Sequence, residues 1–268
     1  MAAAKGSKEV TVNDESTAVT VTDLDMEELE GLAGGGLENV TASDMSIPFL
    51  AILQKGSPEC DEALGEYIDG AKPGVIINTV NKRLYSRDRG ILFVPCSFQS
   101  AMNEWTPREA GGGLVASHPA TTDLIYRTRK NEKKQDVLPN GNILVLTAYH
   151  YGIILDEESG TPGRAVIGMT STQLKKSRAW NSIMAEIKLS GKNGFFTPPT
   201  YSHKYRLTTV PESNNDGNWM GWKIENEGLV NSQILKAGRE FAELVSSGAV
   251  QVSRQPVEKV DPDTGEVV

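Results

Sequence analysis

The sequence has few cysteines, few aromatic residues and no long apolar run. Only two of the 268 residues are cysteines, Cys60 and Cys96, and neither belongs to a CxxC or Cys/His cluster. This pattern argues against a disulfide framework or a cysteine-based zinc site and favours a reducing compartment, the cytoplasm. No apolar run approaches the roughly 20 residues needed to cross a bilayer. The apolar stretch that a secretory signal carries after its first lysines is also missing. We therefore expect neither a membrane span nor a secretory signal.

Sequence signals for catalysis are also missing. The three histidines are scattered, no GxSxG motif is present, and the triple glycine at 111–113 lacks the rest of a phosphate-binding loop. The acidic run at 155–160 fits a solvated turn better than a metal site. We therefore expect no enzymatic activity, no metal and no cofactor.

The formal charge of −8 is unevenly distributed along the chain. Residues 1–44 contain two lysines and ten acidic residues, and residues 251–268 contain two cations and four acidic residues. The stretch between them carries 23 cations and 21 acidic residues. The overall acidity therefore hides a slightly basic body between acidic ends.

Low hydrophobicity and high net charge predict that residues 1–44 form an acidic disordered tail, because such a segment buries too little apolar surface to offset its ordering entropy. Within it, the amphipathic segment 23–32 is compatible with a short helix or a partner-docking segment. We expect a single folded domain over 45–250 and a second flexible acidic tail over 251–268.

The folded body alternates apolar runs with glycine- and proline-rich turns. β-Branched and aromatic runs predict strands, of which 142–156 is expected to be the longest and central. Residues 103–113 predict a loop, and 122–141 a segment that begins as a strand and ends in a turn. Capped amphipathic patterns predict helices at 172–189 and 231–248. The expected strands are 73–80, 90–98, 142–156, 163–169, 200–210 and 218–226.

These elements favour a mainly β fold with added helices, of the α+β class. The specific hypothesis is a five-stranded Greek-key barrel of the oligonucleotide-binding (OB) type, with long loops, an inserted helix and a C-terminal helix. Other mixed β-barrels and sandwiches fit the same pattern, and one sequence does not give the strand order.

Cations alternate with aromatic residues at several places in the body. Single-strand binding needs this combination, because cations follow the phosphates while aromatic faces stack on bases. In the helix at 172–189 we expect the apolar residues Leu174, Ile183, Met184 and Ile187 to be buried and the cations and indole to be exposed. The candidate nucleic-acid-binding residues are Lys82, Arg83, Tyr85, Arg87, Arg89, Tyr126, Arg127, Arg129, Lys130, Lys175, Lys176, Arg178, Trp180, Tyr201, Lys204, Tyr205, Arg206 and Trp219.

Two tryptophans near the end of the body are expected to have different environments. Strand periodicity puts Trp219 and Trp222 on opposite faces, unless a bulge at Gly221 resets the alternation. Trp219 follows a polar loop, so we expect it to be the accessible one and Trp222 to belong to the core.

The chain contains, in this order, the segments MSIPFLAILQKGSPE, GAKPGVIINTV, ILFVPC, EWTPRE, TAYHYGIIL and MTSTQLKKSRAWNSIM. Together they resemble a group of bacteriophage single-stranded DNA-binding proteins of replication and recombination. The resemblance covers residues 45–225 and implies an OB-type barrel, coating of single strands, homo-oligomers and a location in the host cytoplasm. It also implies partners among phage replication or recombination proteins, reached through the acidic tails. Unlike many of that group, this chain does not end on an aromatic residue.

Two alternatives remain open from the sequence. One is a virion or assembly protein whose acidic N-terminus acts as a scaffold-like tail. The other is a single-strand annealing recombinase, which would pair complementary strands. Binding to oligo(dT) is expected of a DNA-binding protein and not of an assembly protein. An annealing assay would then separate a recombinase from a protein that only coats single strands.

Overall fold

The computed structural model describes residues 26–33, 35–39, 46–155, 157, 162–215, 217–248 and 250. The chain divides into two units, Met1–Met45 and Ser46–Val268. The first contains a short helix, α1 (Met26–Gly31), within the segment where the sequence allowed one. The predicted C-terminal tail at 251–268 and most of the predicted N-terminal tail lie outside the described residues.

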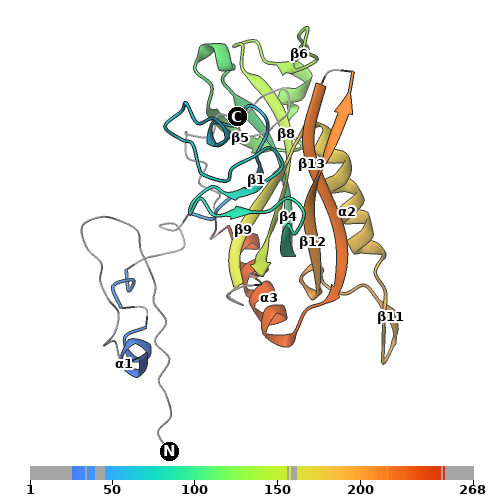
Figure 1. The fold of residues 1–268 in the computed structure, drawn as a ribbon. Helices are drawn as coiled ribbons and strands as arrows, with labels where there is room; N and C mark the ends of the chain where they lie inside the picture. The colour runs from blue at the N-terminus through green and yellow to red at the C-terminus, as the bar shows by residue number, and fades with distance from the viewer. Residues whose placement is uncertain are drawn as a thin grey trace, which may run out of the picture. The chain divides into compact units, whose positions relative to one another are not determined.

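Two long antiparallel strands form the centre of the second unit. β4 (Ile91–Trp105) and β8 (Ile143–Leu155) pair along almost their whole lengths, with a bulge between Pro95 and Ser97. β12 (His203–Asn214) pairs with the start of β4, and β13 (Gly217–Leu229) pairs with β12. β9 (Pro162–Met169) pairs with the other edge of β8. At this end the strand order is therefore β13-β12-β4-β8-β9 (Figure 1).

The two central strands change neighbours towards the other end of the sheet. There β5 (Leu114–Pro119) pairs with β4, β7 (Asp136–Val137) with β8, and β6 (Arg129–Lys130) with β7. The whole sheet is antiparallel and curled (Figure 1).

Smaller elements complete the unit. β1 (Leu50–Ile52), β2 (Ile76–Asn78) and β3 (Leu84–Tyr85) form a three-stranded sheet, and β10 (Leu189–Gly191) and β11 (Gly194–Phe196) form a hairpin. A bridge from Phe49 to Val166 joins the small sheet to β9. Short 3₁₀ helices lie at Pro58–Cys60, Arg108–Ala110, Asp123–Arg127, Ser171–Gln173 and Thr200–Ser202.

Two helices pack on opposite faces of the large sheet. Because side chains alternate along a strand, Phe93 and Val94 of β4 belong to different core clusters. α2 (Leu174–Glu186) adds Trp180 to the Phe93 cluster, and α3 (Ser232–Ser246) adds Phe241 to the Val94 cluster. The sheet is therefore covered on both sides.

The sequence predicted six of the thirteen strands in the described residues and the helices α2 and α3. It did not predict β1, β3, β5, β10 or β11, and two specific expectations were wrong. The strands at 142–156 and 163–169, the closing hairpin and both helices are confirmed, and the strand at 142–156 is central. It is not the longest, because β4 continues to Trp105 through residues read as the start of a loop. The strand-like start expected near residue 122 is instead the 3₁₀ helix Asp123–Arg127, in which the Leu124 amide donates to the Thr122 hydroxyl.

Hydrogen bonds to β8 and to the turn that precedes it explain why polar residues continue β4. The side-chain amide of the buried Asn103 donates to Tyr149 Oη at 2.9 Å. The Glu104 carboxylate accepts hydrogen bonds from Asn140 and Asn142, and these bonds lower its pKa. Satisfied in this way, both residues can be buried in a strand.

The fold is thus mainly β, with a curled antiparallel sheet and few helices, as the sequence indicated at the level of fold class. In the part of the chain that the structure describes, no helix is both long and apolar enough to cross a membrane.

Candidate nucleic-acid interface

The buried side of α2 differs from the one that the sequence predicted. Ser177, Trp180 and Met184 are buried, whereas Ile183 is 44% exposed. Spacings of three and four residues place the buried side chains on one helix face. The predicted stripe was therefore wrong at Ile183, whereas Met184 is buried, Leu174 packs partly buried against the core and Ile187 is half-buried.

Trp180 is the centre of an aromatic cluster beneath α2. It is 1% exposed, and its ring is stacked on the His150 imidazole with centroids 4.5 Å apart. Tyr205, also 1% exposed, meets the indole edge-on at 5.5 Å. The predictions that Trp180 and Tyr205 stack on bases were wrong, because packing between α2 and the sheet already covers both rings.

Lys176 is used inside the protein. Its ammonium forms an ion pair with Glu212 of β12 and donates to the Trp222 carbonyl of β13. Both contacts fasten α2 to the sheet. Lys176 is therefore better explained as a structural cation than as the phosphate contact predicted from the sequence.

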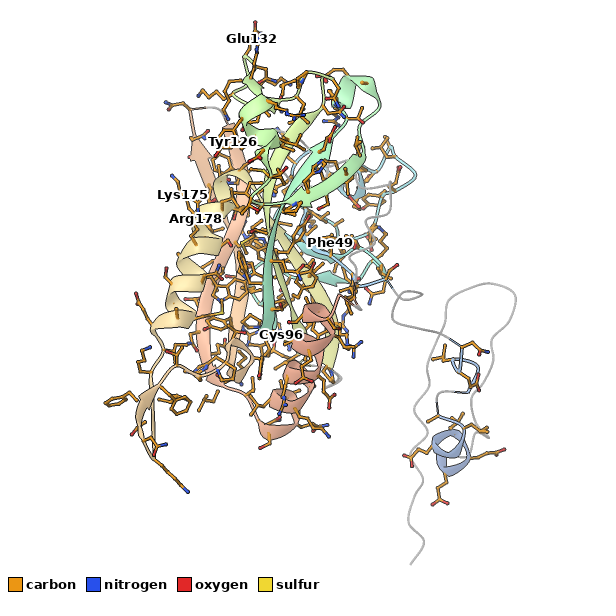
Figure 2. The ribbon with its side chains drawn as sticks, turned by 180° about the vertical axis from the view of Figure 1, so that it is seen from behind. Phe49, Cys96, Tyr126, Glu132, Lys175 and Arg178 are labelled. Atoms are coloured by element: carbon orange, nitrogen blue, oxygen red, sulfur yellow. The ribbon has the colours of Figure 1, made fainter. Side chains whose placement is uncertain are left out.

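Lys175 and Arg178 lie on the solvent side of the same helix. Both are exposed, and no carboxylate among the described residues forms an ion pair with either of them. Figure 2 shows both side chains on the outer side of α2. These two predicted contacts are therefore accessible to an external anion.

A second group of predicted residues lies at the end of the molecule where α2 begins. Tyr126 is 85% exposed, and Arg127 and Arg129 are exposed without an ion pair to any described residue. Figure 2 shows Tyr126 on the same side as Lys175 and Arg178. Lys130 differs, because its ammonium lies 2.7 Å from Asp136. We call Tyr126, Arg127, Arg129, Lys175 and Arg178 the basic face.

Three other predicted residues line a separate cleft of about 230 Å³, which we call the arginine cleft. They are Arg83, Tyr85 and Arg89, and Glu157 lines it with them. The Arg83 guanidinium lies over the Tyr85 ring, 5.3 Å from its centroid. Tyr85 is half-buried against the core.

Carboxylates neutralise much of the arginine cleft. Arg206 lies beside it and makes two hydrogen bonds to Glu157, at 2.7 and 2.9 Å, and a third to Glu227 at 2.8 Å. Arg89 lies 3.3 Å from the same Glu157. The hydrogen bonds from Arg206 lower the pKa of Glu157, so this carboxylate stays ionised at neutral pH. A phosphate would have to compete with it.

The remaining predicted residues are scattered. Lys82 is exposed in a turn with a positive φ of 57°, and Arg87 lies 3.6 Å from Asp88. Tyr201 packs against the core cluster that contains α3, and Lys204 is half-buried on β12. Nothing in the described part of the chain joins these four to one surface.

The two tryptophans of β13 have the different environments that the sequence predicted. Trp222 is 3% exposed and belongs to the core, whereas Trp219 is half-buried. The Trp219 indole donates to Glu212 Oε2 at 2.9 Å, which restrains the ring. It lies near the tip of the β12–β13 hairpin.

Sequence reasoning missed a second cleft, of about 250 Å³, between α2 and the middle of β4. Phe98, His150, Asn181 and Met184 contribute to its lining. The cleft depends on the bulge in β4 and on the return of residues 197–200 beside α2. Neither feature leaves a signal in local sequence, so no pattern could have indicated it.

Within the described residues, no group of three or more His, Cys, Asp or Glu side chains is placed to hold a metal ion. The two cysteines are free thiols, with Cys96 buried. The features that stand out chemically are thus the basic face and the two clefts.

Comparison with known proteins identifies a phage family. The sequence matches the family described as Pam3 phage gp34-like protein over residues 15–251, and this chain belongs to that family. No curated protein and no solved structure matches it.

Proposed function

We propose that this phage protein binds single-stranded DNA without sequence preference, and that the basic face contacts the strand. The observation that carries the proposal is the contrast among the predicted cations. Arg127, Arg129, Lys175 and Arg178 have no carboxylate partner among the described residues. Most of the other predicted cations are paired, as Lys176, Arg89 and Arg206 are.

Unpaired surface cations suit a polyanion because their charge is not compensated within the fold. Each phosphate contact releases condensed counterions, which makes binding favourable at low salt and weak at high salt. The exposed Tyr126 ring adds a face on which any base can stack. Together these groups favour sequence-independent binding.

The proposal extends to the finer fold and to the role in the phage. We propose that the β13-β12-β4-β8-β9 region is an elaborated barrel of the OB type. The function would then be protection of single strands during phage DNA replication or recombination, with the acidic termini contacting other replication proteins and the protein forming homo-oligomers.

Titration of labelled oligo(dT) at several salt concentrations tests the proposal. Changing Arg127, Arg129, Lys175 and Arg178 to Gln should weaken binding at low salt. It should also flatten the log–log salt slope by about 2.8, at roughly 0.7 for each phosphate contact. The matched control changes four exposed cations elsewhere, Lys55, Lys72, Lys236 and Arg239, and should keep the native slope.

Failure of the native protein to bind oligo(dT) at low salt would refute DNA binding and favour an assembly role. An unchanged slope in the quadruple variant would move the interface away from the basic face. If binding holds, rapid pairing of complementary strands would identify a strand-annealing protein instead of a passive coat.

A further inference from the structure

The cleft between α2 and β4 combines apolar walls with an open aromatic side chain. Met184 of α2 and Pro198 contribute apolar surface to it. Phe98 is 44% exposed, and its ring lies 5.1 Å from the His150 imidazole. At about 250 Å³ the cleft is smaller than the pockets that hold drug-sized ligands, so its size suits one ring system.

The polar groups of this cleft are not used up by the protein. The Asn181 amide and the Ser97 hydroxyl make no side-chain hydrogen bond to any described residue. His150 is fully buried, and its Nε2 lies 2.8 Å from Ser177 Oγ, while its Nδ1 has no partner among the described residues. An unpaired buried polar atom is destabilising, so such a group calls for an explanation.

The state of His150 adds to the chemistry of the cleft. Burial lowers the pKa of this imidazole to about 3, so the ring is neutral at physiological pH and carries one donor and one acceptor nitrogen. The cleft therefore offers hydrogen-bonding groups without a formal charge. This combination suits a neutral heteroaromatic ring better than a phosphate.

Cations lie beyond both ends of the cleft. Arg178 precedes Asn181 by three residues and Ala185 by seven, so the three side chains share one side of α2. At the other end, the Lys188 ammonium donates to the Thr197 hydroxyl, and Thr197 lines the cleft. A polyanion that follows this side of the helix would contact Arg178 and Lys188, with the cleft between them.

We propose that this cleft receives one unstacked nucleobase of the bound strand. The proposal rests on the proposed function and names the part of the ligand that enters the protein. The Phe98 ring supplies a stacking face, and the Asn181 amide supplies both a donor and an acceptor for the base edge. Because an amide can pair with the edge of any base, the cleft anchors a strand without selecting a sequence.

The test compares an oligo(dT) with an oligomer of equal length in which abasic spacers replace the thymidines. Native protein should bind oligo(dT) at least about tenfold more tightly, since one stacked base accounts for such a difference. Ala185→Trp, which fills the mouth of the cleft from an exposed position, should reduce this preference to the part that stacking on Tyr126 contributes and leave the salt slope unchanged. Ala179→Trp makes the same change at an exposed α2 position outside the cleft and should keep the preference.

A second variant tests the cleft without introducing a tryptophan, which could itself contact the DNA. Phe98→Ala removes the stacking face from a partly exposed position and should also reduce the preference, while circular dichroism confirms that the variant is folded. If Ala185→Trp and Phe98→Ala both keep the native preference, the cleft does not hold a base, and the proposed function stands without it. If native protein binds neither oligomer at low salt, both proposals fall.

Discussion

The helices α2 and α3 pack against opposite faces of one sheet, yet they are attached to it in different ways. α3 relies on apolar contacts, with Ile234, Phe241 and Val245 buried. α2 buries the serine at 177 and the indole of Trp180, and it bonds to the sheet through polar groups. The polar attachment fixes the position of α2 more specifically than apolar contact alone would.

The first residues of the two helices show the difference most clearly. Asn231 caps α3, its side chain accepting from the Ile234 amide at 2.9 Å. At the corresponding position of α2, Gln173 does not cap the helix. Instead, Gln173 Oε1 accepts from the backbone amide of Trp222, and Gln173 Nε2 donates to the Glu212 carboxylate, both at 3.1 Å. Here the connection to the sheet takes the place of a helix cap.

Their outer surfaces differ as well. The cations of α3 meet carboxylates one turn away, with Arg239 lying 2.8 Å from Glu243 and Lys236 4.0 Å from Glu240. On α2, Lys175 and Arg178 have no such partners among the described residues. The surface of α3 is electrostatically balanced, whereas α2 carries positive charge at Lys175 and Arg178 that no described carboxylate compensates. The predictions below test this contrast.

The largest effect is expected for Trp180. Trp180→Ala should lower the free energy of unfolding by about 3–5 kcal/mol, because it empties the centre of a packed aromatic cluster. Phe241→Ala on α3 should cost a similar amount, so both helices are needed for stability. Urea unfolding measures both. A loss below about 1 kcal/mol for Trp180→Ala would mean that α2 is not part of the core.

The next largest loss of stability is expected at the first residues of the two helices, where Gln173 bonds to the sheet and Asn231 caps α3. Gln173→Ala should cost about 1–3 kcal/mol, because it leaves the buried backbone amide of Trp222 without a partner and removes one of the hydrogen bonds to the Glu212 carboxylate. Asn231→Ala removes a helix cap and should cost about 1 kcal/mol. Hydrogen exchange of the Trp222 amide should increase in the first variant and not in the second. Equal exchange in both would contradict the role assigned to Gln173.

A smaller loss of stability is expected at acidic pH. Burial opposes ionisation of Glu212, but hydrogen bonds from Lys176, Trp219 and Gln173 outweigh it and lower the pKa of this carboxyl. A carboxyl whose pKa is lower in the folded than in the unfolded state stabilises the fold above its unfolded pKa, and this contribution is lost as pH falls through the folded pKa. Attachment of α2 should therefore weaken below about pH 4. Glu212→Gln should reduce this acid sensitivity in urea unfolding, whereas Glu243→Gln on α3 should not.

The fold was predictable where local pattern decides the structure. β8 and β9 follow apolar and β-branched runs, and α3 follows apolar helical periodicity, each of which a single segment displays. β4 departs from that pattern at Asn103 and Glu104, since their burial depends on hydrogen bonds to residues about 40 positions away.

The candidate site was less predictable because pairing between distant residues decides which cations remain available. Lys175 and Lys176 are adjacent in sequence, yet only Lys176 meets Glu212. Likewise, Arg206 is neutralised by Glu157 and Glu227 from other strands and loops. Sequence identified the right kinds of residue but could not separate paired from unpaired ones.

The smallest effect on stability, and the most specific effect on binding, is expected from removing residues 1–44. The deletion should leave the melting temperature nearly unchanged and should tighten oligo(dT) binding at low salt, because it removes a segment with a net charge of −8 that competes for cations. If that competition acts at α2, a variant with Lys175→Gln and Arg178→Gln should gain less from the deletion than native protein does. The α3 variant with Lys236→Gln and Arg239→Gln should show the full gain. Such a double-mutant cycle measures the coupling directly. Equal gains in all three backgrounds would show that the acidic segment acts on the whole molecule and does not distinguish α2 from α3.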